Sequence, residues 1–265
     1  MKQMFGWMAV AAFWGIALAG LVGCKPSEAI RQGAVLGNGR KPVSLPLDPA
    51  TLGGVTGTVR FTGKPPARVR IDMSQDPACS LTPEDNYSEQ YVVHDSKLAN
   101  AYVYIKSGPG VAMTAPSTTT APVVMNQVGC KYVPHVVALM RGGAVEFRNS
   151  DMTMHNVHVM PVVIGGKETD VSQGPSGAPQ LVQFKDPELM VPVRCNNHPW
   201  MNAFINVADT PFFAVTDTEG NFKIENLPAG NYVIAVLHEK MGEQTMNITV
   251  KPQNTAKANF TYALK

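Results

Sequence analysis

The segment Cys195-Asn196-Asn197-His198-Pro199-Trp200-Met201 contains a thiol, an imidazole and a thioether within one short stretch. A second imidazole, that of His155, stands upstream of it. Two histidines and a cysteine in a trigonal plane, with a methionine on a long axial bond, are the ligand set of a mononuclear type 1 (blue) copper site. Sulfur ligands favour Cu(I) and imidazole suits both oxidation states, so this donor set predicts one-electron exchange.

The pattern around the segment predicts how the four donors meet. The alternation from Leu189 to Cys195 puts every second side chain on one face, which indicates a strand ending at the cysteine. The asparagines and the proline of the segment form turns and fold the chain back towards the sulfur. His155 follows a separate alternating strand, residues 145–148, and the turn at residues 149–151. His158 points to the opposite side of the extended chain and is not expected to bind the metal.

These residues match a known family in sequence order. Met154-His155-Asn156-Val157-His158, taken with Cys195-x-x-His198-Pro199-Trp200-Met201, resembles the amicyanin and plastocyanin group of cupredoxins, and amicyanin most closely in loop length. The resemblance covers roughly residues 90–207 and implies a Greek-key β-sandwich. It implies equatorial ligands at His155, Cys195 and His198, an axial ligand at Met201, and supporting residues at Asn156, Pro199 and Trp200. The departures are Trp200, where amicyanin carries another aromatic residue, and long insertions before and after the first histidine.

The resemblance also implies a mechanism. His198 would be the electron port, with an exposed ring edge, and His155 the buried anchor. Trp200 would pack over the copper or form a hydrophobic docking surface, so a redox protein partner is expected near His198 and Trp200. All four coordination positions are filled by protein, so no open position remains for a substrate and the chain is not expected to be an enzyme.

Other interpretations stay open. A lone cysteine at a strand end is usually a buried thiol, a lone methionine usually fills a core, and zinc also accepts cysteine and histidine. A membrane-anchored copper-binding or storage protein would hold the metal without redox cycling. A cell-surface adhesion or carbohydrate-binding module would carry a structural metal and exposed aromatic residues. The candidates for such a face are Phe212, Phe213 and Tyr232.

The N-terminus predicts export. Residues 1–23 begin with a positive charge at Lys2 and continue as a short apolar stretch, which is typical of a signal peptide. Leu21-Val22-Gly23-Cys24 resembles a bacterial lipobox, which implies lipid attachment to Cys24 and a membrane-surface location outside the cytoplasm. An ordinary secretory signal that happens to end beside a cysteine is the alternative.

With the lipid site and the copper site assigned in this way, each of the four cysteines has an expected role. Cys24 takes the lipid and Cys195 the metal. Cys79 and Cys130 are then expected to pair, because unpaired thiols in an oxidising compartment tend to form disulfides. A second metal site using Cys130 and His135 is the alternative.

The C-terminal part has a different pattern. Residues 215–232 read V-T-D-x-x-G-x-F-x-I-x-x-L-P-A-G-x-Y, which resembles the carboxypeptidase regulatory-like (transthyretin-like) β-sandwich. Residues 208–265 are short for a sandwich with two covered faces. We therefore expect this sandwich to take its first strand from residues 54–62, with the cupredoxin domain inserted. A second β-domain packed end to end is the alternative.

Composition agrees with an all-β protein of 265 residues. Charged residues make up 16%, the net charge is +2, and there are 23 glycines and 21 prolines. No basic stripe indicates nucleic-acid binding. The expected divisions are a signal peptide at 1–23, a flexible tether at 24–52, an N-terminal strand and connection at 53–89, a cupredoxin domain at 90–207 and a regulatory-like sandwich at 208–265.

Overall fold

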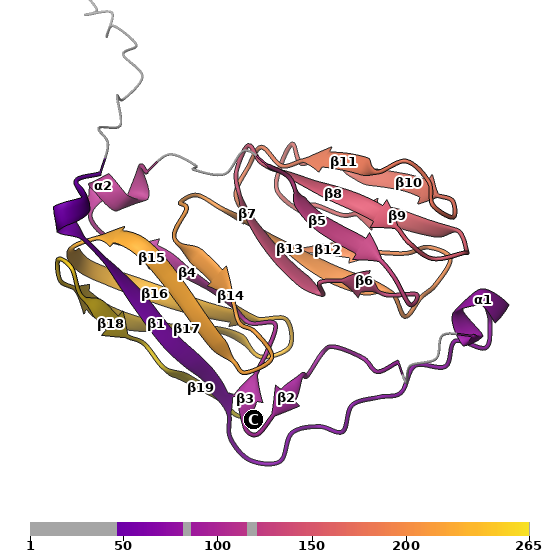
Figure 1. Ribbon diagram of the computed structural model, residues 1–265, viewed down its shortest axis with the longest axis horizontal. Coiled ribbons are helices and arrows are strands. Elements are labelled where there is room, and N and C mark those ends of the chain that lie inside the picture. Colours follow the sequence, from indigo (N-terminus) through magenta and orange to yellow (C-terminus); the bar gives the residue numbers. More distant parts are fainter. Residues whose placement is uncertain (1–46, 82–85, 116–120, 265) are drawn as a thin grey trace, which may run out of the picture. The chain divides into compact units, whose positions relative to one another are not determined.

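The computed structural model describes residues 47–81, 86–115 and 121–264. These residues form four β-sheets (Figure 1). Their buried apolar side chains form two separate clusters. The helices among them are short: η1 (Pro49–Thr51), α1 (Pro77–Ser80) and α2 (Gly110–Met113). The fold is therefore all-β, as predicted.

The expected signal peptide (1–23), lipidated Cys24 and most of the expected tether (24–52) lie outside the described residues. None of the helices in the described ranges is long and apolar enough to cross a membrane.

One pair of sheets, here called the ligand-bearing sandwich, contains residues 123–208. Its first sheet has the order β10 (Thr169–Gln173), β9 (His155–Val159), β12 (Glu188–Arg194), β13 (Asn202–Ala208) and β7 (Val136–Met140). Its second sheet has the order β11 (Gln180–Gln183), β8 (Ala144–Asn149), β5 (Val123–Gln127) and β6 (Tyr132–Val133). The pairs β13–β7 and β5–β8 are parallel, and the other neighbours are antiparallel.

Alternation of apolar and charged residues explains how these sheets share a core. In β8 the side chains of Val145 and Phe147 are fully buried, whereas Arg148 is exposed. Met125 from the same sheet, and Val157 and Val193 from the other, belong to the same buried cluster. Side chains with a period of two residues therefore face one another across the two sheets, as in other β-sandwiches.

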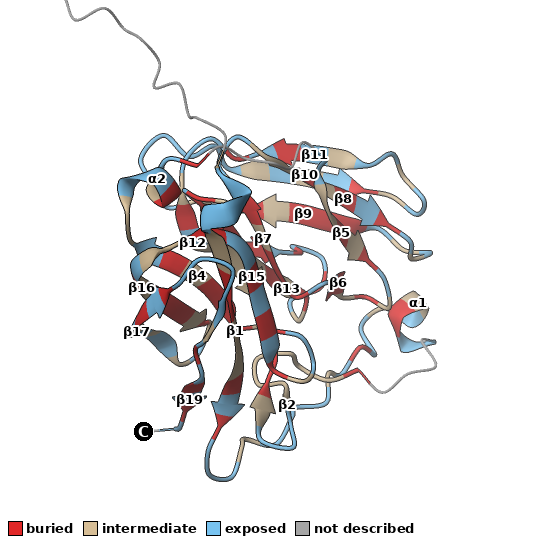
Figure 2. Ribbon diagram, turned by 60° about the vertical axis from the view of Figure 1, so that its left-hand side comes forward, coloured by how far each residue is buried: buried red, intermediate tan, exposed pale blue. Residues whose placement is uncertain are grey.

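The second pair of sheets, the terminal sandwich, combines both ends of the described chain. One sheet has the order β15 (Asn221–Pro228), β1 (Leu52–Phe61), β3 (Lys97–Leu98) and β2 (Val93–His94), and β18 (Thr255–Lys257) and β19 (Phe260–Tyr262) also pair with β1. The other has the order β14 (Phe213–Val215), β4 (Tyr102–Ser107), β16 (Gly230–His238) and β17 (Gly242–Val250). Exposed and buried residues alternate at the start of β15 (Figure 2).

Two details differ from the sequence expectations. The expected cupredoxin boundary at residue 90 is wrong, because β4 pairs with β14 and β16 of the terminal sandwich. Leu189 is 40% exposed and does not share the inward face of β12. A β-bulge between Glu188 and Val191, with Met190 at φ 52°, shifts the alternation at that point. A bulge adds one residue and so moves its neighbours to the other face.

Candidate metal centre

The loop between β12 and β13 is closed by its own backbone. The Cys195 N–H donates to the Met201 carbonyl at 3.2 Å, and the Met201 N–H donates to the His198 carbonyl at 2.9 Å. The two ends of the loop are thereby held together at the end of an antiparallel strand pair. This local closure turns three predicted donors back over the end of the ligand-bearing sandwich.

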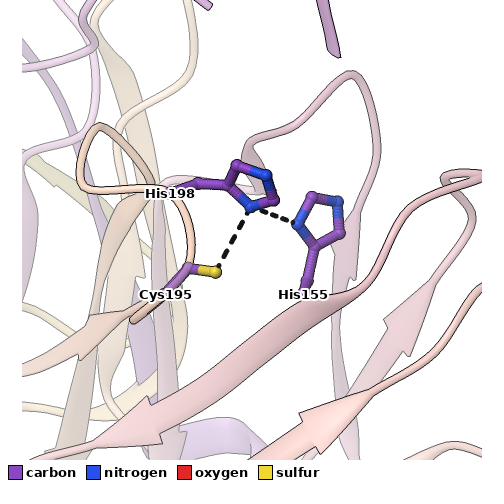
Figure 3. A group of neighbouring side chains, drawn as sticks. All are labelled: His155, Cys195 and His198. Carbon is purple, nitrogen blue, oxygen red and sulfur yellow. Dashed lines mark hydrogen bonds between the residues drawn. The ribbon is translucent and has the colours of Figure 1, made fainter. Parts of the chain in front are cut away.

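Three of the predicted donors converge in the interior. The Nδ1 atoms of His155 and His198 are 3.0 Å apart, and the Cys195 Sγ lies 3.5 Å from the His198 Nδ1 (Figure 3). His155, at the start of β9, is fully buried, and the other two side chains are nearly so. Their donor atoms lie within 4.8 Å of one another, close enough to share one ion. Met201 is also buried, in the same apolar cluster as Cys195.

Asn156 joins the ligand loop to the strand that carries the first histidine. Its backbone N–H donates to the Cys195 Sγ at 3.2 Å, and its side-chain oxygen accepts from the Asn196 N–H at 3.4 Å. Its side-chain nitrogen donates to Asp170 at 2.7 Å. An N–H directed at a thiolate stabilises the negative charge on sulfur, so Asn156 both holds the loop and favours the ligand form of the cysteine.

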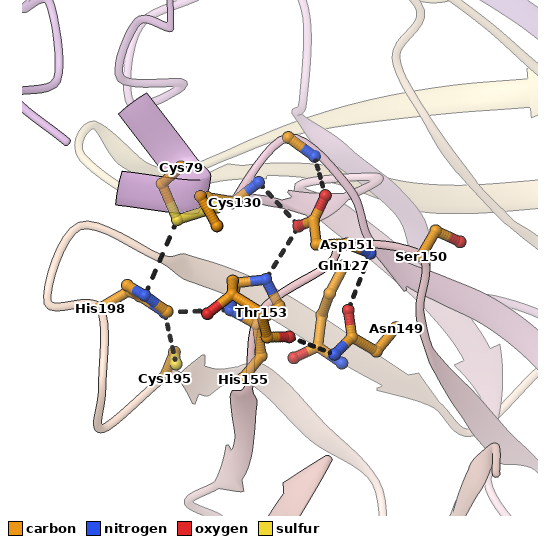
Figure 4. Close-up of polar contacts among 12 residues, drawn as sticks. Cys79, Gln127, Cys130, Asn149, Ser150, Asp151, Thr153, His155, Cys195 and His198 are labelled. Carbon is orange, nitrogen blue, oxygen red and sulfur yellow. Dashed lines mark hydrogen bonds and ion pairs between the residues drawn. A yellow bond between two sulfur atoms is a disulfide. The ribbon is translucent and has the colours of Figure 1, made fainter. Parts of the chain in front are cut away.

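Each of the two imidazole rings contacts a carboxylate through its Nε2 atom. The His155 Nε2 lies 2.8 Å from the Asp151 Oδ2 (Figure 4). The His198 Nε2 lies 2.9 Å from the Asp76 Oδ2. When Nε2 carries the proton and donates it to a carboxylate, the lone pair of Nδ1 is left for a metal. Each Nδ1 is the atom that faces the other donors. The arrangement of both rings thus fits metal binding through Nδ1.

Neither carboxylate was predicted from the sequence as a partner of a ligand histidine. Asp151 stands four residues before His155 in a recognised turn, and this spacing was the available signal. Asp76 is remote in sequence from His198, and only its position beside Cys79 placed it in a predicted disulfide loop.

A disulfide connects the two carboxylate-bearing segments. Cys79 and Cys130 are bonded, with their Cα atoms 5.7 Å apart. The Cys130 N–H donates to Asp151 at 2.8 Å, whereas Cys79 lies in α1, which Asp76 caps by accepting from the Ala78 N–H at 2.8 Å. Because Cys130 is used in the disulfide, the alternative metal site with His135 does not form.

The expectation of an exposed His198 edge is wrong. The residue is 3% exposed, because α1 and the disulfide cover its Nε2 side, with the Cys79 Sγ 3.7 Å away. Trp200 is half-buried, and its ring centroid lies 5.1 Å from that of His198. Its Nε1 donates to the Cys130 carbonyl at 3.2 Å. Pro199 remains exposed. Trp200 therefore packs against both the ligand ring and the disulfide turn.

The remaining histidines named above lie apart from the centre. His158 contacts Asn196 and Glu168, away from the three donors. His135 is buried, with its Nε2 2.6 Å from Glu239 and its Nδ1 3.1 Å from the Asn202 carbonyl.

Charge stabilises the thiolate before any metal arrives. Burial raises the pKa of the Cys195 thiol, but hydrogen bonds, chiefly that of His155, lower the pKa to about 7. Burial lowers the pKa of His155, yet its hydrogen bonds to Asp151 and Cys195 raise the pKa to about 9. The hydrogen bond with His198 lowers the pKa of Asp76 to about 2. The site therefore favours a thiolate beside an imidazolium.

These pKa values predict proton release on metal binding. His155 holds its proton up to a pKa of about 9 and must lose it to offer a lone pair, so about one proton should leave at pH 8. Release should rise below the pKa of about 7 of Cys195, because the thiol then also gives up a proton, and the contribution of His155 should vanish above about pH 10. Calorimetric titration with Zn²⁺ in two buffers of different ionisation enthalpy measures the number. Heats that do not depend on the buffer at pH 8 would contradict the assignment.

One protein family and several solved structures resemble parts of this chain. The family model of the carboxypeptidase regulatory-like domain matches residues 193–263. This range begins inside β12, whereas the C-terminal strands of the terminal sandwich begin at β14 and are completed by β1 and β4. No curated protein matches the chain.

Among solved structures, the similar ones include copper proteins. The Cu-containing nitrite reductase of Thermus scotoductus SA-01 is 24% identical, with 39% of this chain covering 27% of that one at a TM-score of 0.30. The purple cupredoxin of Nitrosopumilus maritimus is 18% identical (32% of this chain, 99% of that one, TM-score 0.28). Amicyanin of Paracoccus versutus is 20% identical (40% of this chain, 97% of that one, TM-score 0.30). Cupredoxins are therefore among the structural neighbours of this chain, and residues 193–263 match the carboxypeptidase regulatory-like domain.

Proposed function

We propose that this protein is an extracytoplasmic type 1 copper protein that carries single electrons. The observation that carries the proposal is the convergence of one buried thiol and two Nδ1 atoms whose rings are both held through Nε2. His155, Cys195 and His198 would hold the copper, with Met201 as the axial ligand. A copper ion in such a site supplies a one-electron couple between Cu(II) and Cu(I).

The residues of the chain fit such an ion by their chemistry. The donors combine one soft thiolate with two imidazoles, and the surrounding cluster of Phe147, Val157 and Val193 is fully buried. A dry, preformed site lowers the rearrangement that accompanies a change of metal charge, because few water dipoles must reorient. In this proposal the protein catalyses no reaction itself, since its own side chains fill the coordination positions.

The proposal includes a location and a partner. Export by residues 1–23 and lipid attachment at Cys24 would fix the protein to a bacterial membrane facing away from the cytoplasm. The partner would be a redox protein. Because His198 is covered, the partner would dock beside the exposed Pro199 and the half-buried Trp200 rather than on the imidazole itself.

The adhesion-module alternative loses its main support. Phe212 and Tyr232 are 3% exposed and belong to the core of the terminal sandwich, and Phe213 is only partly exposed. The storage alternative uses the same ligands and differs only in redox behaviour. It is the second candidate, and the burial of the ligand His198 is the observation that favours it, because a closed site limits exchange with partners.

Titration of the purified protein with Cu(II) tests the proposal. We expect an intense visible thiolate-to-copper absorption that saturates at one equivalent and is bleached by a mild reductant. The Cys195→Ser variant, which replaces a nearly buried thiol by a smaller polar group, should lose the band altogether. A colourless complex would contradict the copper electron carrier. A band that resists chemical reduction would favour storage.

A further inference from the structure

The turn formed by residues 76–80 covers the outer edge of His198. It belongs to the connection between β1 and β2, outside the strands of the ligand-bearing sandwich. The disulfide of Cys79 attaches it to the β5–β6 turn at Cys130. The side chain of His198 beneath it is 4% exposed, whereas that of Asp76 is 20% exposed. The turn thus separates the imidazole from solvent and presents a carboxylate to it.

The two oxygens of Asp76 have different partners. The Oδ1 accepts from the Ala78 N–H at 2.8 Å and caps α1. The Oδ2 lies 2.9 Å from the His198 Nε2 and also accepts from the Thr153 hydroxyl at 2.8 Å. The cap of α1 uses only the Oδ1 of Asp76, so capping does not explain the position of the Oδ2. The second oxygen is fixed by Thr153 in the position where it meets the imidazole.

We infer that Asp76 is a positioning residue for His198. Its carboxylate, delivered by the disulfide-tethered turn 76–80, holds the ring with Nδ1 towards Cys195, and the turn closes the outer edge of the ring to solvent and partners. The inference rests on the proposed function for its importance, but the contact between Asp76 and His198 involves only side chains of the protein. It makes Asp76, a residue outside both ligand motifs, a determinant of metal affinity and access.

Chemistry distinguishes this role from simple helix capping. Serine caps helices as well as aspartate does but is too short to keep a second contact with the ring, so Asp76→Ser removes positioning and keeps the cap. Asparagine keeps the size of the side chain but has one oxygen and one NH₂ group. If its oxygen caps the helix, its NH₂ faces Nε2 and favours the tautomer with the proton on Nδ1. That tautomer cannot bind a metal through Nδ1.

The first experiment uses the full-length, metal-free protein. Histidine acylation by diethyl pyrocarbonate, followed by peptide mass spectrometry, reports the exposure of each ring. We expect His198 to react at least tenfold faster in Asp76→Ser than in the unchanged protein. His94, which is exposed, is the internal standard. Asp72→Asn is the matched control, because Asp72 lies on the same connection, binds the Ser74 N–H and has no contact with a ligand. Equal acylation rates of His198 in all of these proteins would overturn the inference that the turn shields the ring.

The second experiment measures metal affinity by competition between the protein and a chelator for Cu²⁺. Loss of a partner that orients a metal-binding histidine typically weakens metal binding by about 10–100-fold. We expect a loss of that size in Asp76→Ser and Asp76→Asn, and none in Asp72→Asn. Asp76→Asn keeps the side-chain volume, so it reports on positioning even if Asp76→Ser folds poorly. Undiminished affinity in a folded Asp76→Asn protein would overturn the positioning role.

The two proposals fail in different ways. If the unchanged protein binds no copper, the electron-carrier proposal fails, while the acylation rates and the ring ¹⁵N shifts of His198 still report on Asp76. We expect those shifts to show the proton on Nε2 in the metal-free protein and on Nδ1 in Asp76→Asn. If copper binds with a thiolate band but the variants behave as the unchanged protein does, only the role of Asp76 is lost.

Discussion

Replacing both Cys79 and Cys130 by serine is expected to lower the free energy of unfolding by about 4 kcal/mol. The disulfide closes a loop with a sequence separation of 51 residues, and the entropy that it removes from the unfolded chain grows with the logarithm of loop length. Both cysteines are buried, so the serines also leave hydroxyl groups in an apolar cluster. Denaturant unfolding followed by fluorescence and circular dichroism measures the change.

The disulfide variant should also affect the metal centre. Cys130 holds Asp151 through its backbone N–H, and Cys79 lies on the turn that Asp76 caps. Loss of the bond loosens both carboxylates at once, so metal affinity should fall further than in Asp76→Ser alone. For the stability measurement, Cys195→Ser is the control, because it removes a buried sulfur that forms no cross-link. A stability loss under about 1 kcal/mol would mean that the loop is held by its other contacts.

The ligand loop was predictable because its information is local. The order of donor residues, the strand before them and the turn formers between them all lie within a few residues of Cys195. His155 could be predicted as a further ligand because a strand and a turn precede it. The carboxylate of Asp76 could not be predicted as the partner of His198, because it reaches the ring through a tertiary contact and belongs to no sequence motif. The same contact buries His198, so the predicted exposure of its ring edge was wrong.

The partners of individual strands were harder to predict than their faces. Tyr102, Val103 and Ile105 of β4 are buried, but the sequence does not show which sandwich buries them, so β4 was assigned to the wrong one. The bulge at Met190 had no sequence signal, and it reversed the expected side of Leu189. A period of two residues specifies a face within a strand, whereas strand pairing depends on contacts between distant segments.

The second large effect is expected at Gly57, in the middle of β1. Replacement by alanine should lower the free energy of unfolding by roughly 3 kcal/mol or more, at or above the upper end of the usual cost of overpacking. A Cβ there would lie 1.6 Å from the Ala258 carbonyl oxygen and 2.7 Å from a ring carbon of Phe222. The nearer atom belongs to the backbone, so no side-chain rotation relieves the clash.

The location of Gly57 makes this substitution a test of the terminal sandwich as well. β1 pairs with β15 on one side and with β18 and β19 on the other, so separating Gly57 from Ala258 would break contacts between the two ends of the described chain. Gly110→Ala is the matched control, because a Cβ at this exposed first position of α2 meets nothing within 4 Å. It should be neutral or stabilising by a few tenths of a kcal/mol. Equal stability of the two variants would show that β1 does not run against Ala258, and the sheet that joins residues 52–61 to the C-terminal strands would have to be reassigned.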